Sequence, residues 1–148
     1  VVRVVGPSGF FIREAEDPSP ALFVGTGTGL TPFRSMVHAA IAAGSVAPLW
    51  ILLGVRHEAD ILYGEELREL ERAHPNVRFE ITLSQPGPAW SGRTGYVQAH
   101  VGPLLGELGA PEAHVYICGL ERMVKSVRAL CRGDLGVGRK NLHQERYD

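Results

Sequence analysis

Short apolar runs alternate with longer amphipathic stretches along most of this 148-residue chain. Runs that are rich in Val, Ile and Leu and bounded by polar or turn residues are typical of buried strands. Four such runs predict strands, and a fifth strand is predicted at Asn141–Glu145 without this composition. The four runs are Ala21–Thr26, Pro48–Val55, Val77–Leu83 and Ala113–Cys118.

The stretches between these runs place apolar residues three and four positions apart, as amphipathic helices do. Strands that alternate with helices form parallel sheets with right-handed crossovers and helices on both faces. We therefore expect an α/β fold of three layers, doubly wound around a five-stranded parallel sheet. The predicted helices are Pro32–Ala43, Gly64–Ala73, Tyr96–Leu108 and Leu120–Cys131.

The first twenty residues differ from this repeating part. Residues 1–12 predict a strand, a turn at Gly6–Gly9 and a short second strand, because Gly and Pro interrupt an apolar pattern. Residues 13–20 are polar, which is typical of a linker. Since the chain starts with Val rather than Met, we expect it to be a piece of a longer protein or a processed one.

A glycine-rich turn, Gly25–Pro32, joins the first predicted strand to the first predicted helix. Glycines let an anion reach backbone N–H groups without meeting a Cβ. The N–H groups at the start of the helix carry partial positive charge. We expect Thr31 to cap that helix and Pro32 to be its first residue. The turn is therefore a candidate phosphate loop, although a bare connection could also use these residues.

Composition argues against several kinds of function. The net charge of −1 and the pI of about 6.6 give no electrostatic basis for binding nucleic acid or an anionic membrane. No apolar run is long enough to span a bilayer. Cys118 and Cys131 form no CxxC pair and the histidines lack metal-ligand spacing, so we expect a reduced, cytoplasmic protein without a metal site.

Ligands of doubly wound sheets bind at the carboxyl ends of the strands. There the first loop departs from the GxGxxG fingerprint, since Leu30 replaces the third glycine. The second strand ends in Arg56 and His57 rather than in the acid that binds a ribose, which disfavours an ordinary Rossmann dehydrogenase. Arg56 could pair with a phosphate or could be a solvated surface residue.

The later carboxyl-end loops offer further candidates. Ser84 and Arg93 could bind a ribose or a phosphate, whereas we expect Trp90 to cover apolar surface. Cys118 ends the fourth strand next to Gly119, where a flat ligand could approach the backbone. A cysteine at the end of a strand can equally be an ordinary core residue.

Six motifs cover nearly all of the chain. In their order they resemble the pyridine-nucleotide domain of the ferredoxin–NADP⁺ reductase superfamily, especially its NADH-dependent oxygenase reductases and flavohaemoglobin-like members. The motifs are GPSGFF at Gly6–Phe11, GTGTGLTP at Gly25–Pro32, LLGVR and DILYGEEL within Leu52–Leu67, WSGRTGYV at Trp90–Val97, CGLERM at Cys118–Met123 and HQERYD at His143–Asp148.

The resemblance implies which residues meet a nucleotide. The glycine-rich turn would hold the pyrophosphate and nicotinamide side, and the ends of the second and third strands would lie near the adenosine. The end of the fourth strand would lie beside the nicotinamide. The cofactor-binding candidates are Gly25, Thr26, Gly27, Thr28, Gly29, Thr31, Pro32, Arg56, Ser84, Gln85, Arg93, Gly119 and Met123.

The resemblance also implies a flavin. Glu145 and Tyr147 would face its ring, and with Cys118 they are the catalytic candidates. NAD(P)H would pass a hydride to the flavin while protein side chains mainly position the two rings. Members that prefer NADP carry a Ser-Arg pair where this chain has Ser84 and Gln85, and the missing guanidinium favours NADH.

The flavin-binding domain itself is expected to be absent. Residues 1–20 would be its last strands plus a linker, and residues 21–148 would be the NAD(P)H-binding domain. FAD would be held mainly by the missing domain, so the isolated chain is expected to be inactive. The expected partners are that N-terminal domain and an electron acceptor such as a ferredoxin, an iron–sulfur domain or a haem domain.

Two other functions stay open at this point. The GxGxG pattern of Gly25–Gly29 also fits an S-adenosylmethionine-dependent methyltransferase, although no acid precedes Gly25 or ends the second strand. A non-catalytic regulatory subunit could keep the fold without a flavin partner.

Overall fold

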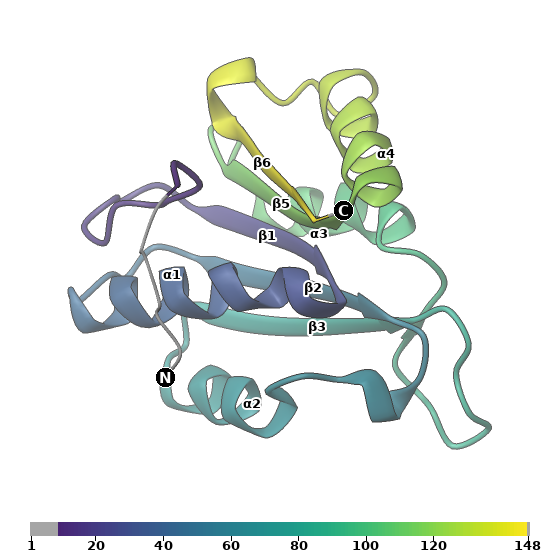
Figure 1. Cartoon of the computed structure of the whole chain (residues 1–148). Coiled ribbons are helices and arrows are strands. Elements are labelled where there is room, and N and C mark those ends of the chain that lie inside the picture. The colour runs from purple at the N-terminus through teal and green to yellow at the C-terminus, as the bar shows by residue number, and fades with distance from the viewer. Residues whose placement is uncertain (1–8, 148) are drawn as a thin grey trace, which may run out of the picture.

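The computed structural model describes residues 9–147, and within them six parallel strands form one sheet in the order β4-β3-β2-β1-β5-β6 (Figure 1). The expected count of five strands is wrong by one, because the loop after the third strand adds a strand of two residues at the sheet edge. The strands are β1 (Ala21–Thr26), β2 (Leu49–Val55), β3 (Val77–Leu83), β4 (Arg93–Thr94), β5 (His114–Leu120) and β6 (Leu142–Tyr147).

Helices cover both faces of this sheet, which confirms the three-layer α/β class. One core packs α1 and α2 against the sheet, and a second core packs α3 and α4 against the opposite face. The helices are α1 (Leu30–Ala42), α2 (Gly64–Ala73), α3 (Gln98–Leu108) and α4 (Glu121–Arg132), with short 3-10 turns η1 (Gly27–Gly29), η2 (Glu58–Asp60) and η3 (Arg139–Asn141).

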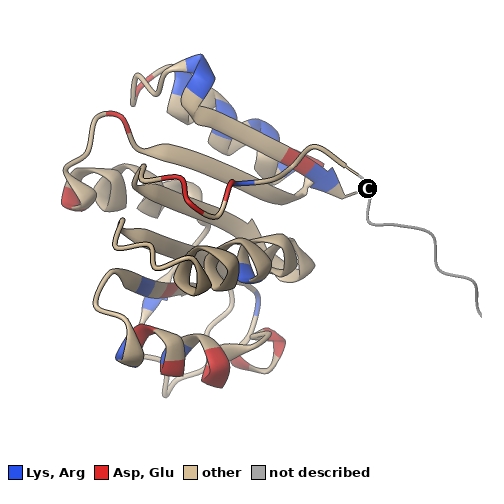
Figure 2. Cartoon of the chain, turned by 90° about the vertical axis from the view of Figure 1, so that its left-hand side faces the viewer, with Lys and Arg blue, Asp and Glu red and all other residues tan. Residues whose placement is uncertain are grey.

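The central strands are apolar because they are buried from both sides. In β1, Ala21 and Phe23 belong to the core beneath α1, whereas Leu22 and Val24 belong to the core beneath α3 and α4. No Lys, Arg, Asp or Glu lies on β1, β2 or β5. Charged residues lie on the outer strands β3 and β6 and, as Figure 2 shows, on the helices and connections, with acidic residues gathered on α2.

Two expected element boundaries are wrong. Helix α1 begins at Leu30 and its N-cap is Gly29, so Thr31 lies inside the first turn and makes no capping bond. The helix begins before the expected Pro32 because the 3-10 turn η1 already gives the backbone a helical course up to Gly29. Strand β5 runs to Leu120 and α4 begins at Glu121, so the separate loop expected after Cys118 is absent.

The short second strand expected before the linker is also wrong. Residues 10–12 form no strand, although they carry the expected apolar side chains. Phe10 and Ile12 are exposed, whereas Phe11 packs with ring centroids 6.1 Å from both Phe33 and Tyr116. The first expected strand and most of the turn at residues 6–9 lie outside the described residues. The buried side chain of Arg13 donates hydrogen bonds to the backbone carbonyls of Glu14, Asp17 and Ser19 and so orders the linker.

Strand order reverses at β1, whose neighbours are β2 on one side and β5 on the other. At its carboxyl end the chain turns through Gly29, which packs directly on the last residues of β5. A Cβ on Gly29 would clash with the Cys118 carbonyl oxygen and would lie 2.6 Å from its carbon. Only glycine fits at this contact, because backbone cannot move aside as a flexible side chain can.

Gly29→Ala should therefore lower the free energy of unfolding by about 1–3 kcal/mol, the usual cost of overpacking. Gly106→Ala is the matched control, since Gly106 lies inside α3 with open space around it. The control should raise stability by about 0.5–1 kcal/mol. Urea unfolding measures both variants, and equal effects of the two substitutions would contradict the close contact.

Two histidines lie side by side near the amino ends of β5 and β6. His114 Nδ1 and His143 Nε2 lie 3.0 Å apart, and the His143 ring stacks on Tyr116 with centroids 4.4 Å apart. Burial and neighbouring His114 lower the pKa of His143, whereas Asp17 in the linker opposes this shift. The folded protein therefore favours the neutral ring.

Stability should fall as the pH drops below 6.5, the ordinary pKa of histidine, because the unfolded chain then takes up a proton before folded His143 does. The loss should be less than about 1 kcal/mol, since the ring is partly exposed. Carboxylates whose pKa is lowered in the folded protein, such as Glu80, change the stability mainly below pH 4.5, the ordinary pKa of a glutamate. Urea midpoints at pH 7.5 and about 5.5 test this, and His143→Gln should remove most of the difference.

Candidate functional site

The carboxyl ends of β1 and β5 meet at the point where strand order reverses. Gly25 pairs with Cys118 in the sheet register, and the next residues, Thr26 and Gly119, touch beyond it. Gly119 has φ +144°, and a Cβ there would strike the Thr26 hydroxyl. Glycine is therefore required here for conformation as well as for space.

The Thr26 hydroxyl is a polar atom without a partner. Its Oγ1 is buried and makes no hydrogen bond to any residue in the range 9–147. A buried hydroxyl without a partner is costly in a folded protein, so it marks a place where a ligand could supply one. Gly27 follows with φ +52° and opens the chain toward the first turn of α1, where Thr28 and Thr31 are exposed.

The start of α1 provides donors for an anion. The N–H groups of the first helical turn have no partners inside the helix and carry partial positive charge. Thr31 and Pro32 both lie in this turn, although Pro32 has no N–H and the Leu30 N–H already donates to the Gly27 and Thr28 carbonyls. Met123 completes the base of the site, since its Cε lies 3.0 Å from the Cβ position of Gly119. The expected turn residues, Gly119 and Met123 are thus brought together.

Cys118 and Tyr147 meet beneath this edge, but neither is activated as a nucleophile. Cys118 is fully buried, and burial raises the pKa of its thiol although Tyr147 opposes the shift. Burial and the contact with Cys118 raise the pKa of Tyr147 to about 12. Both groups therefore stay protonated near neutral pH. Glu145 lies opposite Cys118 in the register of β5 and β6 and is exposed.

The ends of β2 and β3 form a second part of the edge. The backbone N–H of Ser84 donates to Val55 at 3.0 Å, and that of Gln85 donates to Arg56 at 2.9 Å. The Nδ1 atom of His57 lies 2.8 Å from the Gln85 carbonyl oxygen. The structure thus brings Arg56, Ser84 and Gln85 together, as the sequence predicts for the adenosine side.

Arg93 is the predicted site residue that already has protein partners for its charge. Its Nε lies 2.9 Å from Glu80, and its guanidinium also faces Glu107 on α3 at 3.9 Å. Arg78 joins the same network and lies 2.6 Å from both carboxylates. Trp90, expected to cover apolar surface, packs against the core and donates its indole N–H to the Arg93 carbonyl. This network holds β4 against β3 and α3.

Two further side chains lie at the carboxyl edge without having been singled out from the sequence. Tyr96 follows β4 and is 74% exposed, which is unusual for a large aromatic. Gln98 begins α3, and its Oε1 is buried with no hydrogen-bond partner among the described residues. Tyr96 could have been identified from the sequence, because it is an aromatic residue between a glycine that permits a bend, Gly95, and the start of a helix.

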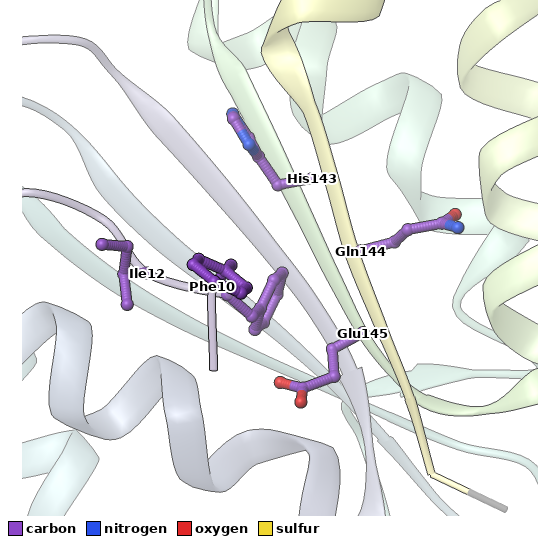
Figure 3. A pocket seen from close by; sticks show the side chains of 6 residues that line it. Phe10, Ile12, His143, Gln144 and Glu145 are labelled. Atoms are coloured by element: carbon purple, nitrogen blue, oxygen red, sulfur yellow. The ribbon is translucent and has the colours of Figure 1, made fainter. Parts of the chain in front are cut away.

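Two hollows flank the edge. One, of about 380 Å³, lies between Phe10–Ile12, which immediately precede the linker, and the middle of β6. In Figure 3 the Glu145 side chain points to the linker side of the sheet, whereas Gln144 points to the opposite side. The other is a groove of about 650 Å³ between α2 and β3, lined by residues that include Ile61, Arg68 and Trp90. Neither hollow contains the Thr26–Gly119 contact.

No group of three or more His, Cys, Asp or Glu side chains in residues 9–147 could hold a metal ion. In that range no helix has the length and apolar character needed to cross a membrane. Both cysteines are buried and free.

The chain is similar to proteins that carry electrons from nicotinamide nucleotides. It is 58% identical to "Ferredoxin--NADP reductase B" of Sorangium cellulosum over 99% of this chain and 62% of that protein. It is 30% identical to the "Toluate 1,2-dioxygenase electron transfer component" of Pseudomonas putida over 99% of this chain and 42% of that protein. The chain therefore spans less than two thirds of the length of these relatives.

Solved structures share the fold over nearly the whole chain. An Amycolatopsis cytochrome P450 reductase matches with a TM-score of 0.80 and 25% identity, over 95% of this chain and 42% of that one. The CS-b5R domains of human Ncb5or in the NAD⁺ form match with a TM-score of 0.81 and 21% identity, over 93% of this chain and 39% of that one.

The family described as the oxidoreductase NAD-binding domain matches residues 23–129, which include the turn after β1 and the junction of β5 with α4. The match agrees with the resemblance seen in the sequence motifs, and it supports neither the methyltransferase nor the regulatory alternative. The chain belongs to this family of oxidoreductase NAD-binding domains.

Proposed function

We propose that this domain positions the nicotinamide of NAD(P)H for hydride transfer to a flavin held by another domain of the same protein. The observation that carries the proposal is the contact of Thr26 with Gly119 at the carboxyl end of β5, where a buried hydroxyl lacks a hydrogen-bond partner among the described residues. NAD(P)H supplies the hydride when bound, and the protein supplies orientation.

Each part of the edge would bind one part of the dinucleotide. The N–H groups at the start of α1 would hold the pyrophosphate, and Thr26 with Gly119 would hold the nicotinamide end. Arg56, Ser84 and Gln85 would lie along the adenosine. Because Cys118 and Tyr147 stay protonated near neutral pH, they would act by packing and hydrogen bonding rather than by taking up a proton.

The linker side of β6 would face the flavin-binding domain. Phe10 and Ile12 are exposed apolar side chains beside Glu145, and together they line the hollow of about 380 Å³ (Figure 3). Burial of such side chains by a neighbouring domain would be favourable. We place the flavin-binding domain before the linker, so that residues 1–20 are its last segment plus the linker and residues 21–148 form the nucleotide domain. Glu145 and Tyr147 would then lie next to the flavin ring.

The electron acceptor would be a ferredoxin, an iron–sulfur domain or a haem domain. Support comes from the relatives, since one is named as a ferredoxin reductase and another as the electron transfer component of a dioxygenase. The isolated domain would lack activity without its flavin domain. A cytoplasmic location and the preference for NADH suggested by Gln85 stay predictions.

Titration of the ¹⁵N-labelled chain with NADH and with NADPH tests the proposal. At about millimolar concentration, backbone amide resonances of Thr26–Leu30 and Gly119 should shift, because a lone domain that binds a dinucleotide without the flavin partner forms a weak complex. Amides of His74 and Asn76, which precede the amino end of β3 at the opposite edge of the sheet, serve as the internal control and should stay in place. If neither nucleotide shifts any resonance at the carboxyl edge, the proposed function is wrong.

A further inference from the structure

The outer edge of β3 is paired along only part of its length. On one side all seven residues of the strand pair with β2, whereas on the other side β4 pairs only with Thr82 and Leu83. Within residues 9–147 no other strand lies beside residues 77–81 on that side. A free strand edge presents backbone N–H and C=O groups to which a strand of another molecule can pair. The groups that occupy this edge therefore decide whether it is open.

Two side chains of α2 occupy the edge at Phe79. The Phe79 N–H donates to Glu71 Oε1 at 2.9 Å, and the Phe79 carbonyl oxygen accepts from Arg68 Nη1 at 2.7 Å. The same Arg68 nitrogen lies 2.9 Å from Glu71 Oε2, so the two side chains also pair with each other. Hydrogen bonds to charged groups are stronger than those between neutral groups. Arg68 and Glu71 thus form a plug that takes the place of a neighbouring strand.

The plug lies outside the buried core. The Arg68 side chain is 44% exposed and the Glu71 side chain is 28% exposed, and neither belongs to the core cluster beneath α2. Arg68 also lines the groove of about 650 Å³ between α2 and β3. Shortening both side chains would therefore uncover the edge at Phe79 without opening a cavity in the core.

The sequence of this edge suits pairing with a second copy of itself. In an antiparallel pair centred on Phe79, the two copies of Phe79 would exchange both backbone hydrogen bonds. Arg78 of each copy would then lie opposite Glu80 of the other, and Val77 opposite Ile81. Opposite charges and apolar residues that face each other across two strands stabilise a sheet. Arg78 and Glu80 already pair within the chain at 2.6 Å, and self-pairing would extend this contact between copies.

We propose that Arg68 and Glu71 close a self-association edge on β3, and that a second copy of this chain pairs antiparallel with residues 77–81 when the plug is removed. The N–H and C=O groups that the plug occupies are the two that this pairing would use. The second copy is the occupant because the strand is complementary in charge to itself around Phe79. The inference goes beyond the proposed function and does not depend on nucleotide binding.

Sedimentation velocity of the double variant Arg68→Ala/Glu71→Ala tests this proposal. The unaltered chain should keep its mass of 16.1 kDa up to a concentration of about 1 mM. The weight-average mass of the double variant should rise toward twice that value over the same range. Its far-UV circular dichroism should match that of the unaltered chain, because the plug lies outside the core.

Two control variants separate the plug from a general effect of charge. Glu69→Ala/Arg72→Ala also removes one acid and one base from α2, but these residues line the groove without bonding to Phe79, so the variant should stay monomeric. Glu71→Gln should stay monomeric as well, since its amide oxygen can still accept from the Phe79 N–H.

Amide exchange at Phe79 locates the association. In the double variant the Phe79 N–H has lost its acceptor, so in dilute solution it should exchange faster than in the unaltered chain. The exchange should slow again at the concentrations at which the mass has risen, because the amide is then paired with the other copy. A rise in mass without this protection would place the contact elsewhere and overturn the proposal.

The proposal would also be overturned if the double variant kept the mass of the unaltered chain at every concentration, or if the unaltered chain itself associated through Phe79. Should circular dichroism show that the double variant has lost its fold, Glu71→Ala alone carries the test. It opens the Phe79 N–H and leaves Arg68 on the carbonyl group, so its mass should rise in the same way at higher concentration. A monomeric Glu71→Ala would then contradict the proposal.

Discussion

The turn after β1 touches the backbone at the end of β5, and the geometry of the functional edge depends on this contact. Gly29 meets the Cys118 carbonyl group, and Gly119 meets Thr26, so side chains are excluded from both positions. The result is a sheet edge where two backbone segments lie in contact next to the start of α1. A dinucleotide needs both features, one for a flat ring and one for its phosphates.

The pattern of apolar residues predicted this framework because the central strands are buried from both sides. β1, β2 and β5 carry no charges, which makes them visible in the sequence. The short β4 has no such signal, since Arg93 and Thr94 are polar and lie in a loop rich in Pro and Gly. Phe10 and Ile12 led to the prediction of a strand that does not form, because they are apolar like strand residues and yet are exposed.

The candidate site could be predicted in part. Glycines at a strand end and the order of the motifs located the turn, the end of β5 and the end of β2. The sequence could not show that the Arg93 guanidinium forms ion pairs with Glu80 and Glu107, because these residues come together only when β4 pairs with β3 in the fold. It also could not show that the backbone of Gln85 holds His57, since a carbonyl group leaves no trace in residue identity.

The central claim is that the nicotinamide lies between the ends of β1 and β5. Intermolecular nuclear Overhauser effects between NAD⁺ and the ¹⁵N,¹³C-labelled chain test it most directly. The account predicts contacts from the nicotinamide ring protons to Thr26 and Gly119. Contacts instead to Ile61 and Trp90, in the larger groove between α2 and β3, would contradict it.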